Sequence, residues 1–250
     1  MLQAKKNKMA LITGGPRGIG RAIALSLADE IDCTLFINYL ENDVTALQTR
    51  ADLEAKGATV HLLKYNLAFP DEINLMFKTI CAQTDTLDYF VHCAAITTFK
   101  PLHTVKPNQW DLTMNISARS FLYSVQCCIP LMINGGKVVA ISSTGSRRFN
   151  MNYGALGVAK ATLESIVQYL AVELAEKKIQ INGVVSGLIF GDKLPQFPNI
   201  EDIVAETLRR TPAGRLGTPQ DVAKLVLFLL TQADWMYGQN IVLDGGFCLT

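Results

Sequence analysis

Three side chains between positions 143 and 160 could together transfer a proton: the Ser143 hydroxyl, the Tyr153 phenol and the Lys160 ammonium. The alanine-rich sequence of residues 153–176 predicts a helix, in which the step from Tyr153 to Lys160 is a rotation of about 700° and a rise of about 10 Å. The two side chains would then share one face, two turns apart. A nearby ammonium lowers the pKa of a phenol and makes it a better proton donor near neutral pH. The alternative is an ordinary amphipathic helix with a Tyr and a Lys at its edge.

A glycine-rich turn near the N-terminus is the second element with chemical meaning. Its pattern is Gly14-x3-Gly18-x-Gly20, and it lies between a short apolar run at 9–13 and a segment with helical spacing at 21–29. Glycines let the backbone approach a pyrophosphate, whose charge is stabilised at the N-terminus of the following helix. We therefore expect a dinucleotide site, the alternative being a glycine-rich loop without a ligand.

Charge near this turn bears on which dinucleotide is bound. An acidic residue usually follows the second strand where a free ribose is recognised, but Asn38 and Tyr39 occupy that place and the first carboxylate is Glu41. Arg17, within the turn, could pair with a 2′-phosphate. This balance favours NADPH, although Glu41 could still reach a ribose and Arg17 could be a solvated surface charge.

The elements that must position these groups alternate along the chain. Apolar strands are predicted at 9–13, 34–39, 59–64, 87–92, 137–142, 179–185 and 240–243. Helices are predicted at 21–29, 45–56, 71–84, 110–131, 153–176 and 219–230. Apolar strands separated by helices predict a parallel sheet covered on both faces, which is a doubly wound α/β fold of one domain spanning 1–250.

Composition excludes several other classes of protein. The chain has 250 residues, 49% of them apolar, and a net charge of +1, which provides no strong field for nucleic acid. The six cysteines and three histidines lack metal-ligand spacing, so we expect no metal and reduced thiols in a cytoplasmic protein. No apolar run approaches the ~20 residues of a membrane span, so we expect no membrane association.

Together these motifs resemble the short-chain dehydrogenase/reductase superfamily over essentially the whole chain. The resemblance rests on the glycine turn, on Asn115 in Met-Asn-Ile, on Ser143, Tyr153 and Lys160, and on Asp244-Gly245-Gly246. It implies a seven-stranded Rossmann fold. Most members have Tyr four residues before Lys, where this chain has Leu156. The longer spacing Tyr153-x6-Lys160 and the segments around Phe197-Pro198-Asn199 and Thr211-Pro212-Ala213 are most similar to the type III NADPH-dependent enoyl-acyl-carrier-protein reductases.

The displaced tyrosine has a physical rationale in that resemblance. A carbonyl reductase needs its acid beside the carbon that accepts hydride, whereas an enoyl reductase develops charge on a thioester oxygen two carbons away. The resemblance therefore implies that Tyr153 bonds the enolate oxygen, Lys160 holds the nicotinamide ribose, Ser143 orients substrate and Asn115 supports a proton relay. Asn115 could instead be a surface or capping residue, and Ser143 an ordinary hydroxyl at a strand end.

The predicted cofactor site extends along the chain. Asn66 could bind the adenine edge, though an Asx turn is an equally good account. Two departures from the superfamily pattern are His92-Cys93-Ala94-Ala95, for the usual Asn-Asn-Ala-Gly, and Ser186-Gly187, for Pro-Gly. The full set of predicted cofactor residues is Gly14, Arg17, Gly18, Ile19, Gly20, Asn38, Tyr39, Asn66, Leu67, Cys93, Ala94, Ala95, Lys160, Gly187 and Ile189.

Residues 188–215 are predicted to form a lid that covers an acyl chain and excludes water. Its apolar residues Phe190, Leu194 and Phe197 could equally be packing residues. Basic residues near the expected mouth could attract an acidic carrier protein, or could be a solvated surface: Arg147, Arg148, Lys193, Arg209 and Arg210.

The predicted function is reduction of a trans-2-enoyl thioester with NADPH, the substrate being bound to acyl carrier protein or coenzyme A, in fatty-acid or related polyketide synthesis. The closest alternative is a 3-oxoacyl-thioester reductase of the same superfamily. An alternative of another class is a non-catalytic NADPH-binding sensor or scaffold. As is usual in the superfamily, we expect a homo-oligomer, a dimer or a tetramer.

Overall fold

A seven-stranded parallel sheet forms the centre of the protein, in the order β3-β2-β1-β4-β5-β6-β7. The computed structural model describes residues 7–191, 194 and 199–250. The strands are β1 Lys8–Thr13, β2 Cys33–Tyr39, β3 Thr59–Lys64, β4 Tyr89–His92, β5 Gly136–Ser143, β6 Ile179–Ser186 and β7 Asn240–Leu243. The strand order reverses between β1 and β4, which is the topological switch point where doubly wound folds bind ligands.

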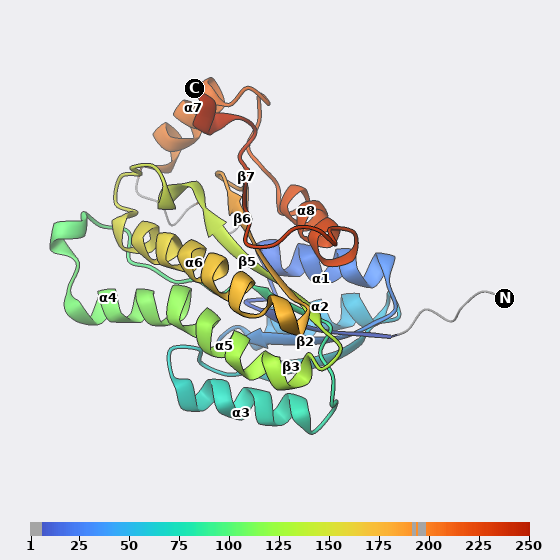
Figure 1. Cartoon of the computed structure of the whole chain (residues 1–250). Helices are drawn as coiled ribbons and strands as arrows, with labels where there is room; N and C mark the ends of the chain where they lie inside the picture. The colour runs from blue at the N-terminus through green and yellow to red at the C-terminus, as the bar shows by residue number, and fades with distance from the viewer. Residues whose placement is uncertain (1–6, 192–193, 195–198) are drawn as a thin grey trace.

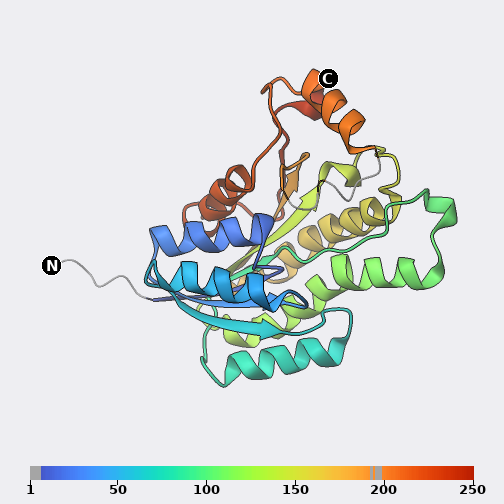
Figure 2. The same ribbon diagram turned by 180° about the vertical axis from the view of Figure 1, so that it is seen from behind.

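Helices cover both faces of this sheet (Figures 1 and 2). They are α1 Gly18–Glu30, α2 Asp43–Glu54, α3 Pro70–Cys81, α4 Pro107–Met114, α5 Ser120–Cys128, α6 Gly154–Glu173, α7 Ile200–Arg210 and α8 Pro219–Thr231. Helices α3 to α6 lie on one face and α1, α2 and α8 on the other, while α7 stands apart beside the C-terminus. The predicted doubly wound fold is confirmed.

Each layer of helices makes its own hydrophobic core with the sheet. One core joins α3, α5 and α6 to the strands through residues such as Phe90, Phe121 and Leu163. The other joins α1 and α8 to the strands through residues such as Ile23, Ile37 and Val226. Because helices cover both faces of the sheet, β2 is buried at all but its last residue and β6 along its whole length, and neither strand alternates between buried and exposed residues.

Helix α6 is the longest helix and belongs to the first core. Its 18-residue window has a mean hydropathy of 1.2, so by length and composition alone it could cross a membrane. However, 56% of that window is buried within the fold, where α6 packs on β5 and β6. It therefore has the composition of a core helix.

The structure differs from the sequence-based prediction at three helices. The predicted helix 110–131 is divided by a π-helical segment, Asn115–Arg119, between α4 and α5. The predicted helix 153–176 begins one residue later, with Tyr153 at its N-cap. Helix α7 was not predicted, because flanking prolines marked 188–215 as an irregular lid; it begins after Asn199, whose φ is +57°.

Truncating a buried aromatic ring tests the first core. Phe121 is fully buried, and its ring centroid lies 6.2 Å from that of Phe90 and 5.5 Å from that of His92. We expect Phe121→Ala to lower the free energy of unfolding by about 3–5 kcal/mol, since it removes a ring and leaves a cavity. Denaturant unfolding checks this. The matched control Phe69→Ala, at a side chain 55% exposed, should cost less than about 1 kcal/mol.

Candidate active site

The glycine turn joins β1 to α1 at the carboxyl edge of the sheet, as predicted. Gly14 has a φ of +66°, and a Cβ there would lie 3.1 Å from the backbone of Ala94 at the end of β4. At Gly20, a Cβ would lie 2.5 Å from the carbonyl oxygen of Gly14. Gly18 and the exposed Arg17 begin α1. Side chains are thus excluded where a pyrophosphate would approach the N-terminus of α1, and the residues fit a dinucleotide.

A buried hydroxyl ties this turn to the end of β4. The Oγ1 atom of Thr13 accepts hydrogen bonds from the backbone N–H groups of Cys93 (3.2 Å) and Ala94 (3.4 Å). It also lies 3.0 Å from Nδ1 of His92. The Thr13 hydroxyl and His92 Nδ1 are thus within hydrogen-bond distance, and the tautomer of the imidazole decides which of them is the donor. The segment His92-Cys93-Ala94 is therefore supported through Thr13.

Burial keeps His92 neutral. Its side chain is fully buried, and burial, together with the positive charge of Lys160, lowers the pKa of His92 from 6.5 to about 3. A histidine is thus accommodated at this strand end because it serves as an uncharged hydrogen-bonding group.

The predicted adenosine-side residues divide into two groups. The Asn38 side chain is buried and donates to the carbonyl oxygens of Leu63 (3.2 Å) and Tyr65 (3.0 Å), so it joins β2 to the end of β3, and the cofactor contact predicted for Asn38 stays a prediction. Tyr39 lies at the strand end, where its hydroxyl donates to Asp43 (2.9 Å).

Lys64 is a charged residue of this region that the sequence analysis missed. It pairs with Tyr39 in the register of β2 and β3, and its ammonium lies 2.7 Å from Asp43. The sequence could have indicated Lys64, because it is the last residue of the strand predicted at 59–64 and the ends of adjacent parallel strands meet at one edge of the sheet.

Asn66 and Leu67 follow β3. Asn66 Oδ1 accepts from the backbone N–H of Ala68 (2.9 Å), which is the Asx turn that was the alternative to an adenine contact. The Asn66 backbone N–H donates to Glu72 (2.6 Å), and Leu67 is buried in the first core. The side-chain contact predicted for Asn66 is therefore replaced by a local turn, and Leu67 can offer only backbone groups.

The three predicted proton-transfer residues come together at the end of β5. Ser143 is the last residue of β5, and its hydroxyl hydrogen-bonds Tyr153 and accepts from the Gly145 N–H (3.2 Å). A Cβ on Gly145 would overlap the Tyr153 ring, so glycine is required beside the phenol. Lys160 is buried and donates to the carbonyl oxygen of Ile141 (2.6 Å).

The pKa of Tyr153 moves opposite to the expected direction. Burial raises it above the usual 10, and the hydrogen bond to Ser143 opposes this rise only in part. We had expected the Lys160 ammonium to lower it. Desolvation dominates because the ring is enclosed, so the phenol stays protonated near neutral pH and remains a proton donor.

Asn115 is the first residue of the π-helical segment and is half-buried. The neighbouring Ser117 hydroxyl bonds both the N–H and the carbonyl of Ile96, each at 3.2 Å. The π-helical segment thus fastens the connection that follows Cys93, Ala94 and Ala95.

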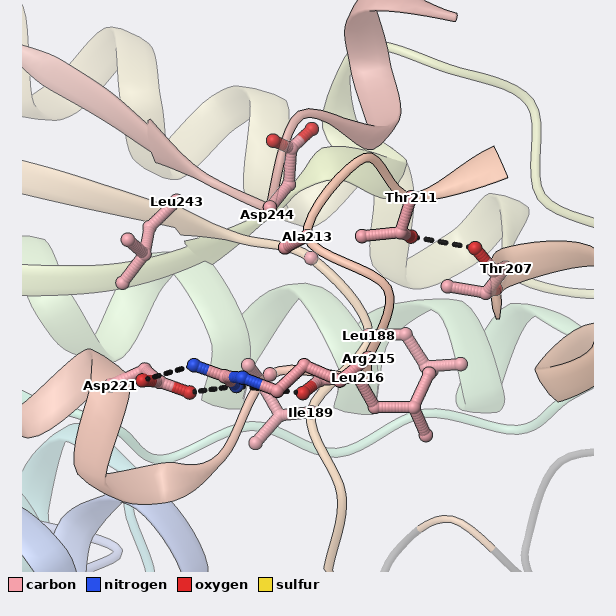
Figure 3. Close-up of a pocket in the computed structure, with 13 residues that line it drawn as sticks. Leu188, Ile189, Thr207, Thr211, Ala213, Arg215, Leu216, Asp221, Leu243 and Asp244 are labelled. Atoms are coloured by element: carbon pink, nitrogen blue, oxygen red, sulfur yellow. Dashed lines mark hydrogen bonds and ion pairs between the residues drawn. The ribbon is translucent and has the colours of Figure 1, made fainter. Parts of the chain in front are cut away.

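Gly187 and Ile189 border a cavity of about 120 Å³ beyond β6 (Figure 3). A Cβ on Gly187 would lie 2.9 Å from Asp244, and Ile189 forms a bridge with Gly217. The lining also contains Arg215, beside Ile189, which holds Asp221 at 2.7 Å and keeps the pKa of that carboxyl well below its usual range. The cavity lies between the end of the sheet and the segment that follows α7.

The arginines near the expected mouth already have acceptors within the chain. Arg147 pairs with Glu164 at 2.9 Å and Arg209 with Glu206 at 2.8 Å. Arg148 donates to the Phe247 carbonyl (3.0 Å), and the Arg210 guanidinium lies 4.8 Å from the centroid of the Phe247 ring. These pairings favour the alternative of a solvated charged surface over a free basic patch.

Three predicted features fall partly or wholly outside the described residues. Lys193, Phe197 and Pro198 lie there, and the predicted lid is described at residues 188–191, 194 and 199–215. Phe190 is 66% exposed, which excludes a role as a core packing residue. Among residues 7–191, 194 and 199–250, no group of three or more His, Cys, Asp or Glu side chains could hold a metal ion.

Comparison with known proteins agrees with this geometry. Residues 14–248 match the family model described as enoyl-(acyl carrier protein) reductase. The chain is 37% identical over 249 residues to the 1-cyclohexenylcarbonyl-CoA reductase of Streptomyces collinus, covering 98% of this chain and 89% of that protein. It is 30% identical over 245 residues to the 3-oxoacyl-[acyl-carrier-protein] reductase FabG of Staphylococcus aureus, covering 97% and 98%.

A solved structure, the Bacillus cereus enoyl-acyl carrier protein reductase with NADP+ and indole naphthyridinone, has a TM-score of 0.89 to this chain. The identity is 26%, and 97% of each chain is covered. The chain therefore belongs to the short-chain dehydrogenase/reductase superfamily. It is an oxidoreductase that uses a nicotinamide cofactor.

Adding one methyl group in the glycine turn tests the dinucleotide site. We expect Gly20→Ala to weaken binding of the reduced dinucleotide at least ~10-fold, because its Cβ would displace the turn from the helix N-terminus. Fluorescence titration measures this. The control Gly57→Ala, at a surface turn with φ +91° and open space around it, should cost about 1 kcal/mol of stability and leave binding unchanged.

The depressed pKa of His92 predicts a pH dependence of stability. Between pH 6.5 and about 3 the unfolded chain binds a proton here that the folded protein does not. The free energy of unfolding should therefore fall as pH falls through this window, by about 1.4 kcal/mol per pH unit. His92→Asn should remove that part of the slope, as measured by denaturant unfolding between pH 7 and 5. An equal slope in both proteins would contradict the assignment; His103→Asn, at an exposed histidine, is the control.

Proposed function

We propose that this protein reduces the C2=C3 double bond of a trans-2-enoyl thioester with NADPH. The observation that carries the proposal is the position of the phenol. Tyr153 lies at the N-cap of α6 and hydrogen-bonds Ser143, seven residues before Lys160. Leu156, which occupies the tyrosine position of a carbonyl reductase, is buried and has no proton to donate. The relative that acts on 1-cyclohexenylcarbonyl-CoA supports the same reading.

The residues of the site have distinct roles in this reaction. NADPH supplies the hydride that reaches the β-carbon of the substrate. Tyr153 donates a hydrogen bond to the thioester oxygen, where negative charge develops as the enolate forms. Burial keeps the phenol protonated for this task. Lys160 would hold the nicotinamide ribose, and Ser143 would orient the phenol and the thioester. Asn115 remains a predicted support for the proton relay.

NADPH is proposed over NADH on the charges at the ends of β1 and β3. Arg17 is exposed at the start of α1, and Lys64 stands beside Tyr39. Both cations could pair with a 2′-phosphate. Asp43 offsets part of this charge through its contact with Lys64, so selectivity is expected to be moderate.

The acyl carrier of the substrate and the oligomeric state of the protein are also part of the proposal. Leu188, Ile189 and Phe190, at the start of the lid, suit an acyl chain. The arginines that are paired within the chain favour coenzyme A as the carrier at least as much as an acidic protein. We keep acyl carrier protein as the other candidate. A homo-oligomer, a dimer or a tetramer, and a cytoplasmic location are proposed on the family resemblance and on composition alone.

A 3-oxoacyl-thioester reductase is the second candidate, and the similarity to FabG favours it. Absorbance at 340 nm separates the two. Purified protein with NADPH should oxidise the cofactor with crotonyl-CoA and not with acetoacetyl-CoA, with NADH as the cofactor control. Oxidation with acetoacetyl-CoA alone would overturn the enoyl assignment.

Removing the phenolic hydroxyl distinguishes an enzyme from a non-catalytic NADPH-binding scaffold. We expect Tyr153→Phe to lower kcat with crotonyl-CoA about 10²- to 10³-fold, the usual cost of one oxyanion donor. NADPH affinity, measured by fluorescence titration, should be unchanged. A variant with full turnover would show that Tyr153 is not the donor. The control Tyr169→Phe changes an exposed tyrosine of the same helix.

A further inference from the structure

Glu164 is a carboxylate on the face of α6 that packs against the sheet, one turn beyond Lys160. Its side chain is only 11% exposed. Oε1 accepts from the hydroxyls of Ser142 and Ser146, each at 2.5 Å, and Oε2 accepts from Nε of Arg147 at 2.9 Å. Among the described residues, Glu164 thus gathers three side-chain donors from one short segment.

These donors lie on both sides of Ser143. Ser142 precedes it in β5, while Ser146 and Arg147 follow it in the connection to α6. The Ser146 hydroxyl also lies 2.7 Å from the carbonyl oxygen of Ser143. Glu164 therefore fixes the backbone before and after the hydroxyl that bonds Tyr153.

The same contacts reach the edge of the sheet. Arg147 donates to the carbonyl oxygen of Asn240 in β7 (3.3 Å), and the Asn240 amide donates to the carbonyl oxygen of Glu164 (3.0 Å). Lys160 and Glu164, four residues apart, thus meet consecutive residues of β5, Ile141 and Ser142.

Stability alone does not account for such an arrangement. Desolvating a carboxylate and a guanidinium costs as much as their attraction returns, and well-packed apolar residues are often at least as stabilising. The Glu164 carboxylate adds geometric specificity, because each of its oxygens accepts a hydrogen bond only from a donor at a defined position. The segment that it directs carries the Ser143 hydroxyl.

We propose that Glu164 is a positioning residue that holds Ser143 within hydrogen-bond reach of Tyr153, acting through Ser142, Ser146 and Arg147. This inference rests on the proposed thioester reduction, in which Tyr153 is the donor. Glu164 itself touches neither substrate nor cofactor in this role.

Variants of Glu164 test the role by kinetics. We expect Glu164→Ala to lower kcat about 10- to 100-fold, the range that a small misplacement of a reacting group costs. The KM for NADPH should change less than about threefold, because the glycine turn is untouched. Glu164→Gln keeps one acceptor and the side-chain volume, so its kcat should lie between that of the wild type and that of Glu164→Ala. The matched control Glu173→Gln, at an exposed carboxylate of the same helix, should have wild-type kcat.

A double variant tests whether Glu164 acts on the reaction through Ser143. If Glu164 acts through Ser143, the loss of kcat in Ser143→Ala/Glu164→Ala should be well below the product of the two single losses. Multiplicative losses, or an unchanged kcat in folded Glu164→Ala, would overturn the inference. Should Glu164→Ala fail to fold, Ser146→Ala removes one donor alone, and its kcat should fall by a smaller factor with the same unchanged KM for NADPH.

Hydrogen exchange separates this inference from the proposed function. Peptides covering 143–152 should exchange faster in Glu164→Ala than in wild type, while peptides covering the glycine turn should not change. This readout needs no substrate. Faster exchange with no crotonyl-CoA turnover in wild type would leave the contact network in place and reject the enoyl function, whereas unchanged exchange would reject the positioning role.

Discussion

The attachment of α6 to the end of β5 is the interaction on which the site depends. Lys160 donates to the carbonyl of Ile141, and Glu164 accepts from the hydroxyl of Ser142, so two charged side chains one turn apart hold neighbouring residues of one strand. This fixes both the rotation of the helix and its position along its axis. Tyr153, at the N-cap, and Ser143, at the strand end, then meet because neither has freedom to move away.

The rest of the fold brings the other components to the same edge. The switch point between β1 and β4 places the glycine turn beside the end of β4, where Thr13 joins the two. A buried neutral His92 completes that joint. The glycine turn after β1 and Ser143 at the end of β5 thus lie on the two sides of β4. In the proposed reaction this would bring the hydride donor and the proton donor together and make the step effectively intramolecular.

The sheet and the order of strands and helices along the chain could be predicted from sequence because each rests on a local pattern. The same holds for the proximity of Ser143 and Tyr153, whose role in proton transfer stays a prediction. Apolar runs separated by helical periodicity are enough for the fold, and Tyr153 to Lys160 is a spacing within one helix. The predictions that sequence could not support depend on contacts between segments distant in the chain. The position of Asn38 at the end of the second strand predicts a cofactor contact, yet its side-chain amide donates to the carbonyl oxygens of Leu63 and Tyr65. The pKa of Tyr153 depends on enclosure, which no spacing reveals.

The importance of Glu164 could have been predicted from sequence. It falls four residues after Lys160 within the buried stripe of α6, where a carboxylate requires hydrogen-bond partners. The π-helical segment could not, because nothing in Asn115–Arg119 distinguishes it from an ordinary helix turn. It arises where Ser117 bonds the Ile96 backbone across a connection distant in sequence.

The burial of Leu156 has an evolutionary consequence. A phenol at that position would have to fit where Leu156 is only 7% exposed, at a cost typical of overpacking. Leu156→Tyr alone would therefore strain the packing around α6, so a tyrosine four residues before Lys160 requires compensating replacements at its neighbours. Homologues that differ in this Tyr–Lys spacing are therefore expected to differ also at the residues packed around position 156.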